Sequence, residues 1–282
     1  MKQSFTIHCQ NEYDKLKTVI VCPPLSLSEG KSLYSINGES HKVSINLDKA
    51  MSQHGEFTRV LKEQGIEVLY LPSIKQFTEG VFTRDVAFTL GEEIFISHMA
   101  HPPRTGEEEI LMNVLNERGI HHHDLMRDHI EGGDVLIDGS TIYVGISNRT
   151  SQQSVDHLQK LLPHYEVISL PFSDEFLHLD CLFNIISPKE AILYPGEFDS
   201  EKESLLRERY DMIEVSSDEQ RTLGVNILSI GEKKVISQPM NEQVNEQLRE
   251  RGYDVILIDF SEIIKAGGAF RCCSLPLLRE KK

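Results

Sequence analysis

Apolar and polar positions along the chain repeat in the order strand, turn, strand, helix, strand. The order is clearest near the C-terminus, where it predicts strands over residues 226–230 and 235–237, a helix over 241–251 and a strand over 255–258. Val244 and Leu248 share one face of that helix, and Gly252 is placed to end it. This stretch therefore predicts a β-hairpin followed by an amphipathic helix and a third strand.

Further stretches upstream follow the same order. The regular ones are predicted as units over residues 86–125, 135–170 and 182–215. The turn Asp138-Gly139 is a strong hairpin signal within one of them. The first unit, over residues 18–71, is less regular because residues 26–41 are rich in Ser, Gly and Asn. We expect residues 26–41 to form a long loop, a feature that is often a lid.

Five units in a chain of 282 residues give about 56 residues each, and a repeat of this length favours units arranged around an axis. A doubly wound parallel sheet is the alternative, because a helix between strands also fits βαβ packing. The hairpin in each unit argues against that alternative, since hairpin strands pair antiparallel. No Pro-, Gly- or Ser-rich linker divides the chain, so residues 1–282 are predicted to form one α/β domain with five pseudo-repeats.

Composition and charge exclude several classes of protein. A formal net charge of −15 opposes nucleic-acid binding, which needs a basic face. No apolar run reaches the roughly 18 residues of a membrane span, and the N-terminus does not resemble a secretory signal, so a cytoplasmic protein without a membrane partner is predicted. The five scattered cysteines favour reduced thiols, and Cys272-Cys273 lacks the spacing of a structural zinc site.

Short polar segments separate the predicted units. They cover residues 82–85, 131–134, 177–180, 218–221 and 267–272. Equivalent points of units around an axis converge, so these segments are expected to line one central pocket. The candidates for substrate binding or catalysis in these segments are Asp85, Glu131, Asp134, His178, Asp180 and Cys272.

A cluster of buried carboxylates requires a cation. A divalent metal is one candidate, but the cysteine would be a poor ligand for magnesium or calcium, and no metal is predicted. A guanidinium group fits better, because its N–H groups pair bidentately with carboxylates. An acidic chain also attracts a small cationic substrate over long range, although solubility explains the same charge.

A bound guanidinium gives the cysteine a role. Resonance deactivates its central carbon, so a strong nucleophile such as the thiolate of Cys272 is needed. His178 would protonate the leaving amine and then activate water, with no cofactor. Asp85 and Asp180 would hold the guanidinium, and Glu131 would hold both the substrate and the imidazole. Each residue alone has an ordinary structural explanation, and only their combination carries the prediction.

The polar segments resemble those of the guanidino-group modifying enzymes, the superfamily of arginine deiminases, amidinotransferases and dimethylarginine dimethylaminohydrolases. The matching segments are Phe82–Asp85, Glu131–Asp134, Ser147–Thr150, His178–Asp180 and Gly267–Ser274. The resemblance implies the pentein fold, a five-bladed ββαβ propeller. It implies Cys272 as nucleophile, His178 as acid/base, Glu131 as its partner, Asp85 as guanidinium ligand, Arg149 as clamp for a substrate carboxylate and Arg104 as a second carboxylate contact. Cys273 is taken as structural.

Length and layout resemble the dimethylarginine dimethylaminohydrolases most, because the helical insertion of arginine deiminases has no counterpart here. Asp180 departs from the methylarginine enzymes, which usually leave room for methyl groups at this position. A carboxylate there prefers an unmethylated N–H edge. The predicted activity is hydrolysis of the guanidinium C–N bond of arginine or a modified arginine.

The alternative is transfer of the amidino group to an amine, and a metal-dependent hydrolase is a further rival. A binding protein with the same fold is also conceivable, but the intact Cys272, His178, Glu131 and Asp85 argue against it. The substrate beyond its guanidinium group is open, and so is the choice between a monomer and a homo-oligomer.

Overall fold

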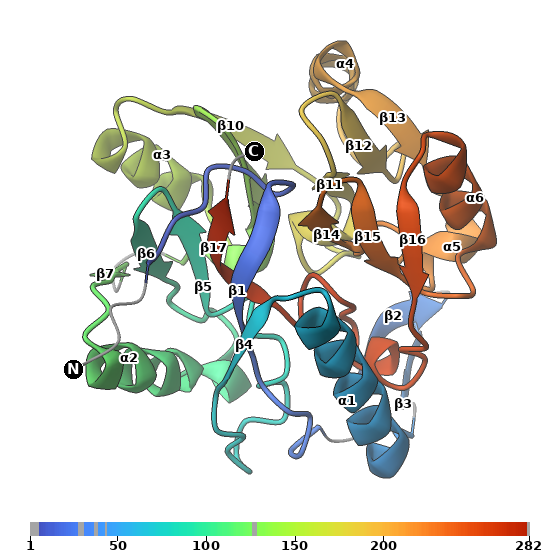
Figure 1. The fold of residues 1–282 in the computed structure, drawn as a ribbon. Helices are drawn as coiled ribbons and strands as arrows, with labels where there is room; N and C mark the ends of the chain where they lie inside the picture. Colours follow the sequence, from blue (N-terminus) through green and yellow to red (C-terminus); the bar gives the residue numbers. More distant parts are fainter. Residues whose placement is uncertain (1–5, 28–30, 37–38, 43, 126–128, 281–282) are drawn as a thin grey trace.

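The computed structural model describes residues 6–27, 31–36, 39–42, 44–125 and 129–280, and its sheets follow one plan. In the C-terminal unit, β14 (Leu228–Gly231) and β15 (Lys234–Ser237) form an antiparallel hairpin. Helix α6 (Glu242–Glu250) then leads to β16 (Asp254–Leu257), which pairs parallel with β15. Figure 1 shows α6 packed beside this small sheet. The predicted ββαβ unit is confirmed.

Three further units follow this plan. Their elements are β5 (Ala87–Leu90), β6 (Glu93–Ile96), α2 (Glu107–Arg118) and β7 (His123–Asp124); β8 (Val135–Asp138), β9 (Thr141–Ile146), α3 (Gln152–Leu161) and β10 (Glu166–Pro171); and β11 (Phe183–Ile185), β12 (Glu190–Leu193), α4 (Ser200–Arg209) and β13 (Asp211–Glu214). In each unit the first two strands pair antiparallel and the third pairs parallel with the second.

The first unit is completed by the end of the chain. β1 (Lys15–Val21) pairs parallel with β4 (Glu67–Tyr70), which follows helix α1 (Leu47–Glu63). Its antiparallel partner is β17 (Leu275–Glu280), and Figure 1 shows β17 lying directly beside β1. Within the described residues this makes five three-stranded sheets, and pairing of the two ends closes the ring. The predicted α/β five-unit fold is confirmed, although the sequence did not predict β17.

Residues 26–41 were predicted as a long loop, and this prediction is wrong over the part that the structure describes. A short antiparallel hairpin is formed there by β2 (Lys31–Ile36) and β3 (Glu39–Lys42). The Gly and Asn residues of this stretch, which are depleted in sheets, lie outside the two strands and hid the strand signal of Tyr34 and Ile36. β2 lies beside the helical turn Ile263–Ala266, which leads into the segment that carries Cys272.

Helix α1 buries its apolar face against that same segment. Asn46 caps the helix by accepting a hydrogen bond from the backbone N–H of Lys49. Phe57 of α1 packs against Phe270 with ring centroids 5.6 Å apart, and Phe270 stacks on Phe260 at 4.4 Å. Because these three rings are fully buried, the aromatic cluster holds the backbone just before Cys272 in place.

Among the described residues, none of the helices combines the length and the apolar character that crossing a bilayer requires.

Candidate active site

Four of the five polar segments predicted to converge, at residues 82–85, 131–134, 177–180 and 267–272, meet in one buried region. The prediction is wrong for residues 218–221, because Asp218 and Arg221 are exposed and Glu219 accepts hydrogen bonds from the backbone N–H groups of Gln243 and Val244. Glu131 precedes the helical turn Gly132–Asp134, which leads into β8, and His178 precedes the turn Leu179–Cys181, which leads into β11. The backbone N–H of Arg84 donates to the carbonyl of Cys272, which ties two of the segments together. Six predicted site residues have at most 3% of their surface exposed: Asp85, Glu131, Asp134, His178, Asp180 and Cys272.

His178 lies between two carboxylates. Its Nε2 is 2.8 Å from Oε2 of Glu131, and its Nδ1 is 3.5 Å from Oδ1 of Asp85. Burial lowers the pKa of His178, but the charges of Asp85, Glu131 and Asp134 outweigh burial and raise it to about 10. Burial likewise raises the pKa of Glu131, but its hydrogen bond to His178 prevails and lowers it to about 2. The pair is therefore an imidazolium and a carboxylate at neutral pH.

Gly133 makes room for this arrangement. A Cβ atom at this position would lie 2.7 Å from the ring of His178 and 2.9 Å from Oδ1 of Asp85. Both distances are shorter than van der Waals contact, so any side chain would displace the imidazole or the acid. The Glu-Gly-Gly-Asp segment thus supplies both a partner for His178 and the space that its ring occupies.

Two polar atoms that face each other in the site lack hydrogen-bond partners. Among the buried side-chain atoms of the described residues, Oδ1 of Asp85 and Nδ1 of His178 belong to this group. Their separation of 3.5 Å makes them an ion pair without a hydrogen bond. Buried polar atoms usually have partners, so Asp85 retains an acceptor that a ligand N–H can use.

The sulfur of Cys272 faces Asp180. Its Sγ is 3.7 Å from each carboxylate oxygen of Asp180 and 3.1 Å from Nδ2 of Asn226. The neighbouring thiol of Cys181, burial and the charge of Asp180 raise the pKa of Cys272 well above its ordinary value. The sulfur is consequently a neutral thiol at pH 7, and a nearby positive charge is what would favour the thiolate.

Asn226 is a site residue that the sequence did not predict. Its Oδ1 accepts hydrogen bonds from the backbone N–H groups of Ala269 and Cys272, both at 3.2 Å. Its Nδ2 donates to the carbonyl of Asp180 at 3.1 Å as well as to the sulfur. The signal that could have found it is a single polar residue in the apolar run of residues 225–228.

Glu12 is a second residue that the sequence did not predict, and it pairs with two buried arginines next to the site. It accepts from Nη2 of Arg84 at 2.8 Å and from Nη1 of Arg271 at 2.6 Å. Nε of Arg271 is 3.4 Å from Oδ2 of Asp180. Burial raises the pKa of Glu12, but the two guanidinium groups prevail and hold it well below its usual range. Arg271, which Glu12 holds in place, therefore helps to fix the position of Asp180.

The two arginines predicted to contact a substrate carboxylate lie in different surroundings. Nη1 of Arg104 is 2.5 Å from Oδ2 of Asp85, while its Nη2 and Nε donate to Glu107 at 2.7 and 3.1 Å. Arg104 is 1% exposed and thus holds Asp85 in this structure. Arg149 is 8% exposed and lies 3.4 Å from both carboxylate oxygens of Glu131. Their contact with a substrate stays a prediction, and Arg149 has the freer position.

Asp134 holds the backbone that carries His178. It accepts from the N–H of Leu179 at 2.9 Å and from the hydroxyl of Ser147 at 2.8 Å. Burial raises the pKa of Asp134 to about 6, against the charge of His178. These contacts point to a structural contribution, and direct binding of substrate by Asp134 stays a prediction.

Possible metal ligands gather in two places within the described part of the chain. Glu93, His121 and His123 form one group at the surface, and Asp180, Cys181 and Cys272 form the other inside the site. In each group the ligand atoms lie within 4.8 Å of one another. Two thiols and one carboxylate suit zinc better than magnesium or calcium. The expectation of a metal-free reaction stays a prediction.

The fold and the site define the class of protein. A ring of five ββαβ units, with a thiol, an imidazole and several acids at its centre, is the arrangement of the guanidino-group modifying enzymes, the pentein superfamily. A family model described as N,N dimethylarginine dimethylhydrolase, eukaryotic, matches residues 34–279. The chain belongs to this family.

Known proteins similar to the chain support this assignment. It is 43% identical to the protein YkgA of Bacillus subtilis, over 96% of this chain and 95% of YkgA. It is 31% identical to the bifunctional arginine dihydrolase/ornithine cyclodeaminase AgrE of Nostoc sp., over 91% of this chain but only 37% of AgrE. The solved N-terminal domain of the cyanobacterial arginine dihydrolase ArgZ, a cysteine-to-serine mutant bound to substrate, has a TM-score of 0.83 at 26% identity, covering 93% of this chain and 98% of that domain.

Replacing Glu131 by glutamine tests the charge that sustains the imidazolium. Glu131→Gln keeps the side-chain shape but removes one of the carboxylates facing His178. Because burial then opposes the charged ring with less compensation, we expect the pKa of His178 to fall by at least about one unit. NMR titration of the imidazole, assigned by its loss in His178→Gln, measures this shift. Glu93→Gln, an exposed acid next to His121, is the matched control and should leave that pKa unchanged.

The same pair determines how stability depends on pH. The pKa of His178 is raised from 6.5 to about 10, so its contribution to folding is complete below pH 6.5 and is lost as the pH rises toward 10. The pKa of Glu131 is lowered from 4.5 to about 2, so its contribution is lost as the pH falls toward 2.

In the titration of Glu131→Gln, a pKa of His178 equal to that in the unchanged protein would contradict the assignment of Glu131 as its partner.

Proposed function

We propose that the protein hydrolyses the guanidinium C–N bond of arginine or a modified arginine through a covalent intermediate on Cys272. The observation that carries the proposal is a buried thiol facing the carboxylate of Asp180, with the His178–Glu131 ion pair and an unpartnered oxygen of Asp85 in the same site. Each of these groups matches one need of the reaction: a nucleophile, an acid and two acceptors for guanidinium N–H groups.

The carboxylates Asp85 and Asp180 would receive the guanidinium group. Oδ1 of Asp85 has no hydrogen-bond partner, and the oxygens of Asp180 have two thiols at 3.7 Å and Arg271 at 3.4 Å as neighbours. These are long contacts, so stronger N–H donors can replace them. A bound cation also lowers the pKa of Cys272, so that the neutral thiol releases its proton to solvent and becomes the thiolate that the reaction requires.

His178 is in the protonation state that the first step needs. With a pKa raised to about 10, its imidazolium can donate a proton to the leaving nitrogen as Cys272 attacks the central carbon. Loss of the amine leaves a thiouronium on Cys272 and a neutral imidazole. The imidazole then accepts one proton from water, the water oxygen bonds to the same carbon, and the sulfur departs as the thiolate while the second proton of that water passes to the released amine. Glu131 stabilises the imidazolium before and after the cycle.

Arginine or a modified arginine fits the site for two reasons. Asp180 favours an N–H edge over a dimethylated nitrogen, because a methylated nitrogen would leave its buried carboxylate without a donor. Arg149 contacts Glu131 and is slightly exposed, so its guanidinium group can bind an α-carboxylate of the substrate. The similarity to the arginine dihydrolases AgrE and ArgZ supports arginine, whereas the family to which the chain belongs supports the methylated form.

Amidino transfer is the second candidate because it uses the same covalent intermediate. The products separate it from hydrolysis. Citrulline with ammonia indicates one hydrolysis, ornithine with ammonia indicates two, and ornithine without ammonia indicates transfer to an amine. Metal dependence is tested by the same assay with a chelator present.

Replacing Cys272 by serine tests the nucleophile. We expect Cys272→Ser to abolish turnover of every guanidino compound that the unchanged protein accepts, because an alcohol at this position is far less nucleophilic than a thiolate. Release of ammonia or alkylamine from a panel of arginine, methylated arginines and agmatine measures turnover. Cys273→Ser, the neighbouring buried thiol, is the matched control and should retain activity.

Folding of Cys272→Ser is followed by circular dichroism and thermal unfolding. A variant that turns over substrate at the normal rate would contradict the proposed nucleophile. A variant that loses its fold would show that the thiol is needed for packing.

Replacing Asp180 tests the choice between free and methylated guanidinium groups. Asp180→Ala removes the carboxylate and makes room, so we expect the ratio of kcat/KM for dimethylarginine to that for arginine to rise. Asp180→Asn has nearly the same size and serves as the control, because it removes the charge without adding space. Steady-state kinetics on both substrates measure the ratio. An unchanged ratio in Asp180→Ala would place Asp180 outside the substrate pocket.

A further inference from the structure

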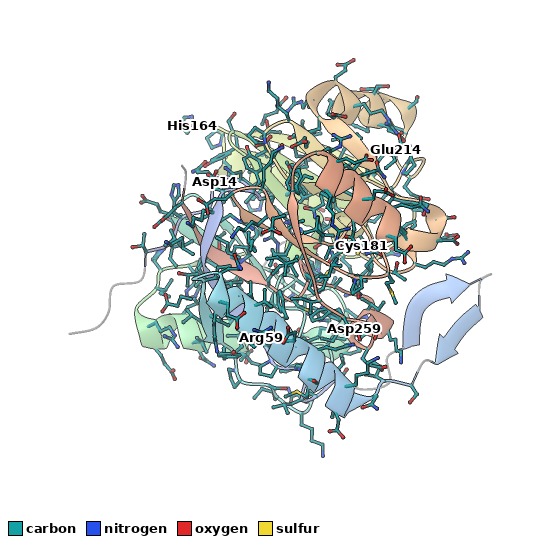
Figure 2. The ribbon with its side chains drawn as sticks, turned by 45° about the vertical axis from the view of Figure 1, so that its right-hand side comes forward. Asp14, Arg59, His164, Cys181, Glu214 and Asp259 are labelled. Carbon is teal, nitrogen blue, oxygen red and sulfur yellow. The ribbon has the colours of Figure 1, made fainter. Side chains whose placement is uncertain are left out.

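The proposed reaction uses one of two thiols that lie together in the site. Cys181 ends the helical turn Leu179–Cys181 and is 3% exposed, as is Cys272. The sulfurs of Cys181 and Cys272 and a carboxylate oxygen of Asp180 all lie within 4.8 Å of one another. Figure 2 labels Cys181 among the side chains of the molecule. No step of the hydrolysis requires this second thiol.

Both sulfurs contact the same acid. Sγ of Cys181 is 3.7 Å from Oδ1 of Asp180, and Sγ of Cys272 is 3.7 Å from both oxygens of that side chain. The two cysteines come from segments far apart in the chain, and each is in a turn between regular elements. A disulfide requires the two sulfurs, which now lie within 4.8 Å of each other, to approach to about 2.05 Å, and rotation of the two short side chains can supply this movement.

We propose that Cys181 is a resolving thiol, which forms a reversible disulfide with Cys272 after a hydroperoxide has oxidised Cys272. The inference rests on the proposed function in one respect only, because it takes Cys272 as the reactive thiol. It adds a site of covalent modification that stops the reaction by occupying the nucleophile.

The chemistry balances with a hydroperoxide as the only oxidant. Cys272 passes its proton to Asp180, which lies 3.7 Å from its sulfur, and the resulting thiolate attacks one peroxide oxygen. The O–O bond breaks, Cys272 becomes a sulfenic acid, and the other oxygen leaves as an alkoxide or hydroxide that takes up the proton from Asp180. The sulfur of Cys181 then attacks the sulfenic sulfur, its proton passes to the departing hydroxide, and the S–S bond forms with release of water. Asp180 lies against both sulfurs and can accept the proton of Cys181 on the way. A dithiol reverses the reaction.

Cys273 is the competing partner because it is adjacent to Cys272 in the chain. Its backbone N–H donates to the carbonyl of Ala269, and its side chain packs in the core cluster with Phe270. A disulfide between neighbouring residues needs a strained ring and a rearranged backbone, which this hydrogen-bonded turn opposes. Cys181 reaches Cys272 from a separate segment and has no such constraint.

Peptide mapping after oxidation tests the inference on the unchanged full chain. The protein is treated with hydrogen peroxide in the presence of a chelator, which prevents a metal ion from occupying the two thiols and Asp180. Unpaired thiols are then alkylated, and the digest is analysed by mass spectrometry. We expect one peptide pair linked through Cys181 and Cys272, a complete loss of hydrolysis, and full recovery of activity with dithiothreitol.

Variants identify the contribution of Cys181. In Cys181→Ser we expect no linked pair, Cys272 oxidised to the sulfinic or sulfonic acid, and loss of activity that dithiothreitol does not reverse. Cys181→Ala serves the same purpose if serine disturbs packing. Cys273→Ser is the matched control and should still form the disulfide and recover. Activity of the unoxidised variants is measured separately.

A disulfide between Cys272 and Cys273 would overturn the inference, and so would peroxide treatment that leaves Cys181 as a free thiol in the unchanged protein. Recovery of Cys181→Ser and Cys181→Ala with dithiothreitol, to the same extent as the unchanged protein, would overturn it as well. The mapping does not depend on turnover, so a protein that forms this disulfide but hydrolyses no guanidino compound would contradict the proposed function alone.

Discussion

Buried acids at the centre of the ring must be balanced by buried cations, and the rest of the site follows from this constraint. An unpaired carboxylate away from water costs several kcal/mol. The protein supplies its own cations to most of its acids: the pairs are Arg84 and Arg271 with Glu12, Arg104 with Asp85 and Glu107, and His178 with Glu131. What remains is one oxygen of Asp85 without a hydrogen-bond partner and the long contacts of Asp180 beside the thiol. In the proposed function, a flat cation such as a guanidinium binds at these two acids.

The fold makes the constraint possible because each unit contributes one segment to the centre. A carboxylate and the imidazole come from separate turns, at Glu131 and His178, while Cys272 comes from the segment that joins the last helical turn to β17. Pairing of β17 with β1 closes the ring and fixes that segment. The stacked rings of Phe260 and Phe270 pack beside this segment, and Asn226 donates a hydrogen bond to the sulfur of Cys272. Preorganised residues of this kind lower the cost of reaching the transition state.

The sequence predicted those parts of the fold that depend on local patterns. Hairpins with clear turns, such as Asp138-Gly139, and helices with one apolar face were found because their signals lie within a few residues. β17 was missed because its partner β1 is at the other end of the chain, and pairing over such a distance leaves no local mark. The hairpin β2–β3 was missed because the Ser, Gly and Asn residues over 26–41 indicated a loop, although β2 itself contains Leu33, Tyr34 and Ile36.

The site was predicted to a similar extent. Motif residues with recognisable chemistry, such as His178 and Cys272, do lie in one buried region. Asn226 and Glu12 were missed because an amide or acid within ordinary sequence gives no sign that it will contact a sulfur or bridge two arginines. The sequence could not predict the pairing of Arg104 with Asp85 either, because this pairing depends on which cation lies next to the acid in the folded structure.

The most direct measurement is the detection of the covalent intermediate. The protein is mixed with arginine, quenched in acid within one turnover, digested and analysed by mass spectrometry. We expect a transient amidino adduct on the sulfur of Cys272 that decays as product appears. Product formation at the full rate without any adduct at Cys272, or with an adduct on another residue, would contradict it.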